Sequence, residues 1–128
     1  MTTGRDDTAK RAPVLVIEDD APTMRLMLWA LGEEGIAATA TDDPARAPDA
    51  VRERQPRVVV LNTGAPSDKK RVLIEAMRQV APVRVIDLAP AGARKNHDSG
   101  ADAYLNQPYA IADLVELIVR LDNHNPPS

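Results

Sequence analysis

Short apolar runs alternate with helical patterns along the chain. Five runs rich in Val, Ile, Leu and Ala predict strands over 14–17, 36–41, 57–61, 83–88 and 103–105. Apolar residues at three- and four-residue spacings predict helices over 21–34, 43–54, 70–80 and 111–121. The segment 89–99 contains Pro90 and Gly92 and has almost no apolar face, so a helix between the last two strands should be short or irregular.

Alternating strands and helices predict an α/β domain with a parallel sheet that is covered on both faces. In such sheets functional groups gather beyond the carboxyl ends of the strands. The polar residues at those ends are Glu18, Asp19 and Asp20 after the first strand, Asn62 after the third, Asp87 in the fourth and Gln107 after the fifth. The flanks are polar, which predicts a disordered tail over 1–11, a domain over 12–122, and a tail or linker start over 123–128.

Composition narrows the class of protein. The chain has 128 residues, of which 44% are hydrophobic, which suits one domain with one core region. It has no cysteine, which excludes disulfides and thiolate chemistry. A net charge of −3 argues against nucleic-acid binding by this domain. No apolar run is long enough to span a membrane and the N-terminus does not resemble a secretory signal, so we expect a soluble, cytoplasmic protein.

Four segments resemble the receiver domains of bacterial response regulators. They are VLVIEDDAPTMR, RVVVLNTGAP, PVRVIDLAP and GADAYLNQPY, and the resemblance covers residues 13–121. The most specific segment is the last, because it contains the receiver pattern GAD-x-Y-L-x-x-P. The resemblance implies a flavodoxin-like (βα)5 fold, a doubly wound sheet of five parallel strands in the order 2-1-3-4-5, and a role in two-component phosphorelay signalling.

The resemblance also assigns roles to positions. In receivers the third strand ends in the aspartate that accepts the phosphoryl group, a Thr or Ser ends the fourth, and a Lys precedes the proline after the fifth. This chain has Asn62, Asp87 and Gln107 at those positions. An amide cannot carry an acyl phosphate, a carboxylate repels a phosphoryl group, and glutamine supplies no charge. The resemblance therefore implies a degenerate receiver that is not an enzyme; a slipped alignment would instead make Asp68 the acceptor.

Two pairs of residues could correspond to the acid pair that holds Mg²⁺ in receivers. Counting from the first strand gives Glu18 and Asp19, whereas counting back from the following helix gives Asp19 and Asp20. We favour the second pair because the helix then aligns without an insertion. We expect Asp19, Asp20 and Asp87 to form an acidic pocket with no lysine among them, in which Asp87→Asn costs no stability. Asp19 and Asp20 would bind Mg²⁺ weakly or not at all, with amide donors from Asn62 and Gln107 satisfying the pocket. No other cofactor is expected.

Three further positions bear on the resemblance. Tyr104 matches the aromatic switch residue of receivers, although a half-buried tyrosine with its hydroxyl in water is the simpler interpretation. The Gln107–Pro108 peptide bond matches one that is cis in the family, which makes Pro108 a cis-proline candidate. Lys69, Lys70 and Arg71 form a basic cluster that we interpret as the solvated start of a helix.

These observations predict a phosphorylation-independent receiver module. It would bind a protein partner in a two-component or related pathway, or form a homodimer. A second possibility is the isolated receiver of a longer transcriptional regulator. A small phosphatase with Asp19 as its nucleophile is disfavoured, because Glu18-Asp19-Asp20 lacks the D-x-D spacing of haloacid-dehalogenase-like enzymes.

Overall fold

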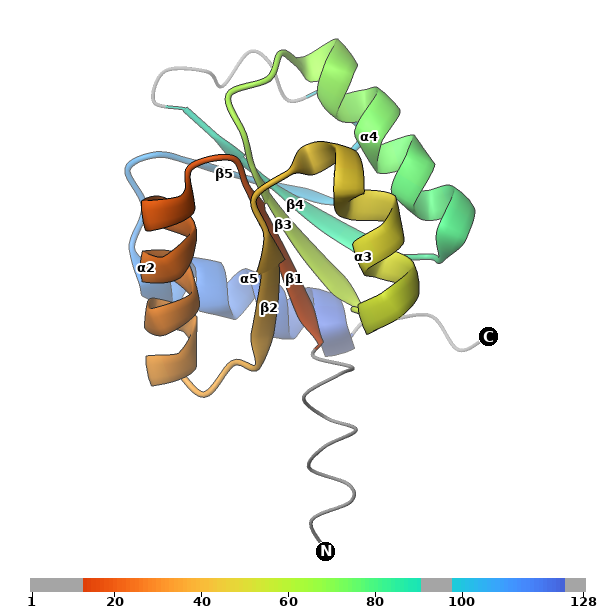
Figure 1. Cartoon of the computed structure of the whole chain (residues 1–128). Helices are drawn as coiled ribbons and strands as arrows, with labels where there is room; N and C mark the ends of the chain where they lie inside the picture. Colours follow the sequence, from red (N-terminus) through yellow and green to blue (C-terminus); the bar gives the residue numbers. More distant parts are fainter. Residues whose placement is uncertain (1–12, 91–97, 124–128) are drawn as a thin grey trace, which may run out of the picture.

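The computed structural model describes residues 13–90 and 98–123, which form a sheet of five parallel strands covered by helices (Figure 1). The strand order is β2-β1-β3-β4-β5, as the resemblance implied. The strands are β1 (Val14–Glu18), β2 (Ala38–Thr41), β3 (Val58–Asn62), β4 (Arg84–Ala89) and β5 (Ala103–Asn106). The predicted flavodoxin-like, doubly wound sheet is therefore confirmed.

Helices cover both faces of the sheet (Figure 1). Helices α2 (Ala21–Glu33) and α5 (Ile111–Asn123) pack on one face, and α3 (Ala47–Arg54) and α4 (Ser67–Val80) pack on the other. The described residues between β4 and β5 contain no helix, and the centre of the predicted irregular helix, 91–97, lies outside the described residues. The predicted N-terminal tail and residues 124–128 also lie outside them. None of the described helices is long and apolar enough to cross a membrane.

The alternation of side chains along the strands produces two cores. Leu15 and Ile17 of β1 join the core under α3 and α4, whereas Val14 and Val16 join the core under α2 and α5. Strands β3 and β4 divide their apolar side chains in the same way. Because the central strands are buried on both faces, they read in the sequence as continuous apolar runs.

Prolines explain two differences between predicted and observed helices. The predicted helix over 43–54 is divided into a 3₁₀ turn, η1 (Pro44–Arg46), and α3. Pro48 consequently lies in the first turn of α3, where its missing N–H breaks no helical hydrogen bond. Helix α4 begins at Ser67, three residues before the predicted start, directly after the N-cap residue Pro66.

Candidate functional site at the carboxyl ends of the strands

The register of the sheet places Glu18 beside Asn62. Strands β1 and β3 are parallel neighbours, and Glu18 pairs with Asn62 at their carboxyl ends. In each strand the valines two and four positions earlier face α2 and α5. Because side chains alternate along a strand, Glu18 and Asn62 leave the sheet on that same face. Glu18 is 4% exposed, and the two side chains meet near the surface of the sheet edge.

A chain of hydrogen bonds connects Gln107, Asn62 and Glu18. The Asn62 Nδ2 group donates to Glu18 Oε1, and Gln107 Nε2 donates to Asn62 Oδ1 at 3.4 Å. The second carboxylate oxygen of Glu18 accepts from the backbone N–H of Asp20 at 3.0 Å. Both ends of the Asn62 carboxamide, and both oxygens of Glu18, are thus engaged by groups of the protein itself.

Burial raises the pKa of Glu18 above its ordinary value of 4.5. The backbone N–H of Asp20 opposes this shift because it stabilises the ionised form, while Asp19, a nearby carboxylate, raises the pKa further. The amide of Asn62 also lowers the pKa, but it is the last of these contributions. The hydrogen bonds from Asp20 and Asn62 therefore offset only part of the effect of burial and of Asp19 on the pKa of Glu18.

Asp20 belongs to helix α2 and not to the pocket, which corrects the favoured acid pair. It is the N-cap of α2, where its carboxylate accepts from the backbone N–H of Thr23 at 3.1 Å and from the Thr23 hydroxyl. These hydrogen bonds from the Thr23 hydroxyl and backbone lower the pKa of Asp20. A hollow of about 400 Å³ at the sheet edge is lined by Glu18, Asp19, Asn62 and Gln107, among others, but not by Asp20. The strand-based pair, Glu18 and Asp19, is the one that faces Asn62.

Asp87 also lies away from the predicted acidic pocket. It pairs in register with Leu61, so alternation directs its side chain toward α3 and α4, opposite to Glu18 and Asn62. There its Oδ1 atom lies 2.8 Å from Lys70 Nζ, and its Oδ2 atom accepts from the Ser99 hydroxyl at 2.8 Å. The prediction that Asp87 joins Asp19 and Asp20 with no lysine nearby was wrong, because Asp87 is one residue out of phase with the pocket.

The described residues do not form the predicted cluster of three carboxylates, Asp19, Asp20 and Asp87. Within 13–90 and 98–123, no three acidic, histidine or cysteine side chains are arranged to hold a metal ion. Mg²⁺ prefers several oxygen ligands in near-octahedral geometry. In this arrangement, oxygens of Glu18 and Asp20 accept hydrogen bonds from groups of the protein.

The segment after β5 carries the other predicted positions. Gln107, at the lysine position, reaches Asn62 as described, and the Gln107–Pro108 peptide bond is cis, as expected. Tyr104 is half-buried, but its hydroxyl accepts from the backbone N–H of Gly100 at 3.2 Å. The half-buried position agrees with the simpler interpretation from the sequence, and the Tyr104 hydroxyl in addition has a hydrogen-bond partner within the protein.

Lys70 is buried and does not belong to a solvated basic cluster, which corrects the expectation from the sequence. Only 5% of this residue is exposed. A signal was present, since Lys70, Ile74 and Met77 follow one another at four- and three-residue spacings and all three are buried on α4. A lysine on the inward face of a helix requires a buried partner, and Asp87 is that partner.

The chain is similar in sequence to bacterial transcriptional regulatory proteins, although no family model matches it. The KDP operon transcriptional regulatory protein KdpE of Escherichia coli is 29% identical over 117 residues, which cover 88% of this chain and 52% of KdpE. The phosphate regulon transcriptional regulatory protein PhoB of Klebsiella pneumoniae is 25% identical over 112 residues, 82% of this chain and 49% of PhoB. The chain thus spans about half the length of these curated relatives.

Solved structures of receiver domains share the fold. The receiver domain of NtrX from Brucella abortus matches with a TM-score of 0.72 at 18% identity, covering 88% of this chain and 99% of that domain. The receiver domain of the Francisella response regulator 1452 matches with a TM-score of 0.71 at 22% identity, covering 88% and 97%. The chain therefore has the fold of response regulator receiver domains, and its sequence is similar to the receiver-containing half of the regulators KdpE and PhoB that it matches.

Proposed function

We propose that this receiver domain is a cytoplasmic, phosphorylation-independent signalling module without catalytic activity. The observation that carries the proposal is the position of Asn62. Its carboxamide occupies the end of β3, donates to Glu18 and accepts from Gln107. A carboxamide held in this way is no nucleophile toward a phosphoryl donor, whereas a carboxylate is.

The charges around Asn62 support the same conclusion. Phosphoryl transfer requires positive charge near the transferred oxygens. The lysine position is the neutral Gln107, and the buried Lys70 is paired with Asp87 under the opposite face of the sheet. Glu18 and Asp19 line the hollow beside Asn62 with negative charge, which disfavours an anionic phosphoryl donor.

A module of this kind acts through binding. Its partner would be a protein of a two-component or related pathway, with a second copy of the chain as the alternative, and this domain would bind no nucleic acid itself. The receiver fold supports a signalling partner in general, while the site supports an input other than phosphorylation.

A second candidate rests on the relatives' length. KdpE and PhoB are named transcriptional regulatory proteins, and the chain matches about half of each. This domain would then be the receiver part of a longer transcriptional regulator, and the length of the native gene product distinguishes the two candidates.

The test uses beryllium fluoride, which mimics a phosphoryl group on a carboxylate. With Mg²⁺ present, we expect no shift of backbone amide resonances at 62–64 or 104–107 relative to Mg²⁺ and fluoride alone. As a positive control, the variant Asn62→Asp/Gln107→Lys supplies a carboxylate and a free ammonium at the two receiver positions that meet at this end of the sheet. Saturable shifts at residues 62–64 of the parent protein would contradict the proposal.

A further inference from the structure

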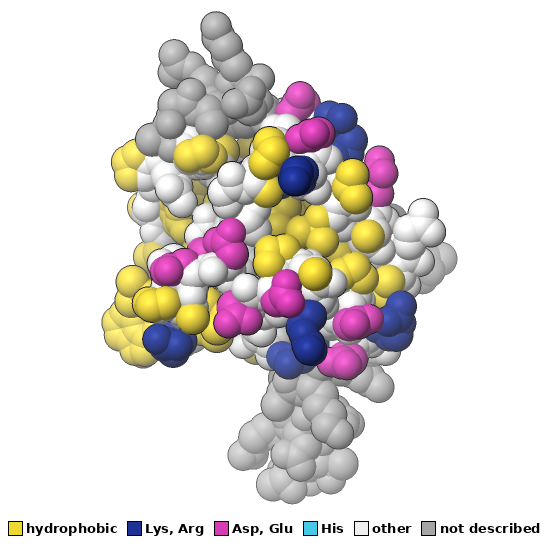
Figure 2. Space-filling model, turned by 45° about the horizontal axis from the view of Figure 1, so that its top comes forward, with side chains coloured by type: hydrophobic (Ala, Val, Ile, Leu, Met, Phe, Trp, Pro, Cys, Tyr) yellow, Lys and Arg dark blue, Asp and Glu magenta, His cyan; other side chains and the backbone are white. Residues whose placement is uncertain are grey.

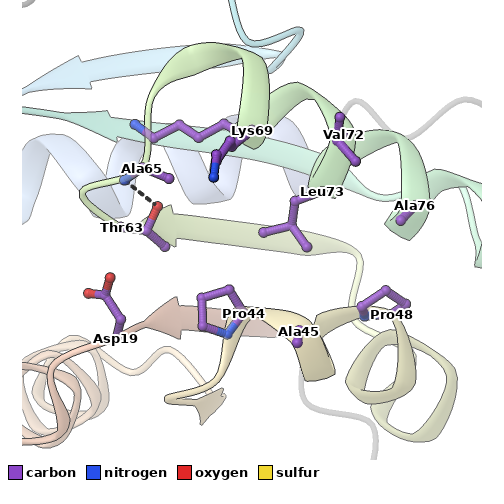
Figure 3. A pocket seen from close by; sticks show the side chains of 11 residues that line it. Asp19, Pro44, Ala45, Pro48, Thr63, Ala65, Lys69, Val72, Leu73 and Ala76 are labelled. Carbon is purple, nitrogen blue, oxygen red and sulfur yellow. Dashed lines mark hydrogen bonds between the residues drawn. The ribbon is translucent and has the colours of Figure 1, made fainter.

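An apolar groove of about 390 Å³ runs between helices α3 and α4. In Figure 3, Pro44, Ala45 and Pro48 lie on one side of it and Val72, Leu73 and Ala76 on the other. Figure 2 shows apolar side chains gathered on this face with charged side chains around them. The volume and the apolar walls are those of pockets that bind small molecules, typically about 300–1,000 Å³.

One end of the groove is polar. Asp19, Thr63 and Lys69 line it there, away from Pro48 and Ala76 (Figure 3). Asp19 and Lys69 are exposed, and neither has an ion-pair partner within the described part of the chain. Lys69 differs in this from its neighbour Lys70, whose ammonium is buried against Asp87.

We propose that this groove binds a small amphipathic organic anion. Its apolar body would lie between Pro44, Ala45 and Leu73, where it removes apolar surface of both partners from water. Its anionic group would pair with Lys69, and a hydrogen-bond donor on the same end of the ligand would face Asp19. Such a ligand uses both unpaired charges, while a wholly apolar ligand would use neither.

The groove adjoins the site at Asn62. Asp19 and Thr63 line both the groove and the hollow beside Asn62, so a bound ligand would contact residues at the ends of β1 and β3. The proposal is independent of the proposed function, because the groove and its unpaired charges exist whether or not the domain accepts a phosphoryl group. Where both hold, the ligand is an input that replaces phosphorylation.

The test compares two matched probes. 8-Anilinonaphthalene-1-sulfonate has an aromatic body, an N–H group and a sulfonate, and N-phenyl-1-naphthylamine is the same molecule without the sulfonate. We expect the sulfonate probe to shift the amide resonances of Thr63, Leu73 and Ala76 saturably, and to bind more tightly than the neutral probe. Lys69→Gln should weaken sulfonate binding by about two- to fivefold and leave the neutral probe unchanged, as expected for one exposed charge pair.

Two further variants localise the binding. Ala45→Trp places a large side chain in the groove from an exposed position of η1 and should abolish the shifts, whereas Ala112→Trp, exposed on α5, should not. Arg25→Gln on α2 is the charge control for Lys69→Gln. Shifts centred on the exposed Leu26 and Trp29 instead, or equal binding by Ala45→Trp, would overturn the proposal. If Ala45→Trp does not fold, the Lys69→Gln variant still tests the proposal. An unchanged affinity of this variant for the sulfonate probe would overturn the proposal by itself.

Discussion

The ammonium of Lys70 and the carboxylate of Asp87 lie 2.8 Å apart inside the protein, with 6% and 2% of their side chains exposed. Ser99 donates to the second oxygen of Asp87, so the three residues connect α4, β4 and the segment before β5. A carboxylate can therefore occupy the hydroxyl position of the receiver fold, because a lysine from α4 neutralises it. The same pairing keeps the Lys70 charge away from the hollow beside Asn62.

Removal of either member of this pair should destabilise the domain. Asp87→Asn leaves a buried ammonium without a counter-charge, and Lys70→Met leaves a buried carboxylate, so each should lower the free energy of unfolding by about 3–5 kcal/mol. Urea denaturation at pH 7 measures the effect. Lys69→Met and Asp42→Asn, at exposed positions, are the matched controls and should change stability by no more than about 0.5 kcal/mol.

The double variant Lys70→Met/Asp87→Asn combines the two single changes and tests whether they are coupled. It leaves no buried charge, so it should be more stable than either single variant, which corresponds to a coupling energy of about 3 kcal/mol or more. If the two single-variant losses simply add, Lys70 and Asp87 are not energetically coupled, and the structural interpretation of Asp87 fails.

The carboxyl group of Glu18 should have a pKa above its ordinary value of 4.5, because burial disfavours the ionised form. A raised folded-state pKa contributes stability that is complete below the unfolded value and is lost as pH rises through the folded value. Carbon-detected NMR of the side-chain carboxyl gives the midpoint directly. Asn62→Ala removes a donor that lowers this pKa and should move the midpoint higher still; a midpoint below 4.5 in the parent would contradict the description of this site.

Asp20 should behave in the opposite sense. The Thr23 donors lower its pKa, so it contributes stability above its unfolded value, near 3.8, and loses it as pH falls through the folded value. Asp20→Ala should consequently lower the melting temperature at pH 7, with the difference closing in strong acid. Asp42→Ala, in an exposed bend, is the control. An equal melting temperature of Asp20→Ala and the parent at pH 7 would contradict the role of Asp20 as the N-cap of α2.

The fold could be predicted because apolar patterning determines it locally. The runs in β1, β3 and β4 are continuous because both faces are buried, and their alternation with helices leads to a parallel sheet. Element ends were less predictable where proline intervenes. Pro44 and Pro48 each open a short element, which the pattern merged into one helix.

The sequence indicates which residues lie at the site, but not which way their side chains point. The residues at the strand ends were identified, but whether Asp87 faces Asn62 depends on strand phase relative to β3, which the order of residues alone does not reveal. The start of α2 at Ala21 likewise decides whether Asp20 caps the helix or faces the pocket. Lys70 was missed because its neighbours Lys69 and Arg71 suggested a solvated cluster.

Restoring a carboxylate at position 62 should cost stability. Asn62→Asp replaces the donor to Glu18 with a second negative charge in register with it, so unfolding at pH 7 should become easier by about 1–3 kcal/mol. The loss should shrink near pH 4, where carboxyl groups protonate, and millimolar Mg²⁺ should raise the melting temperature of the variant more than that of the parent. Asn62→Ala, which removes the donor without adding charge, separates the two causes. A variant as stable as the parent at pH 7 would show that Glu18 does not need the amide.

Intact mass after incubation with acetyl phosphate and Mg²⁺ tests the central claim most directly. The parent protein should gain no hydroxylamine-labile phosphoryl group, because Asn62 offers no carboxylate and Gln107 no charge. Asn62→Asp alone should be labelled weakly, and addition of Gln107→Lys should raise the yield, since it supplies an ammonium beside position 62. A hydroxylamine-labile phosphoryl group on the parent, at Asp68 or any other residue, would contradict a phosphorylation-independent receiver.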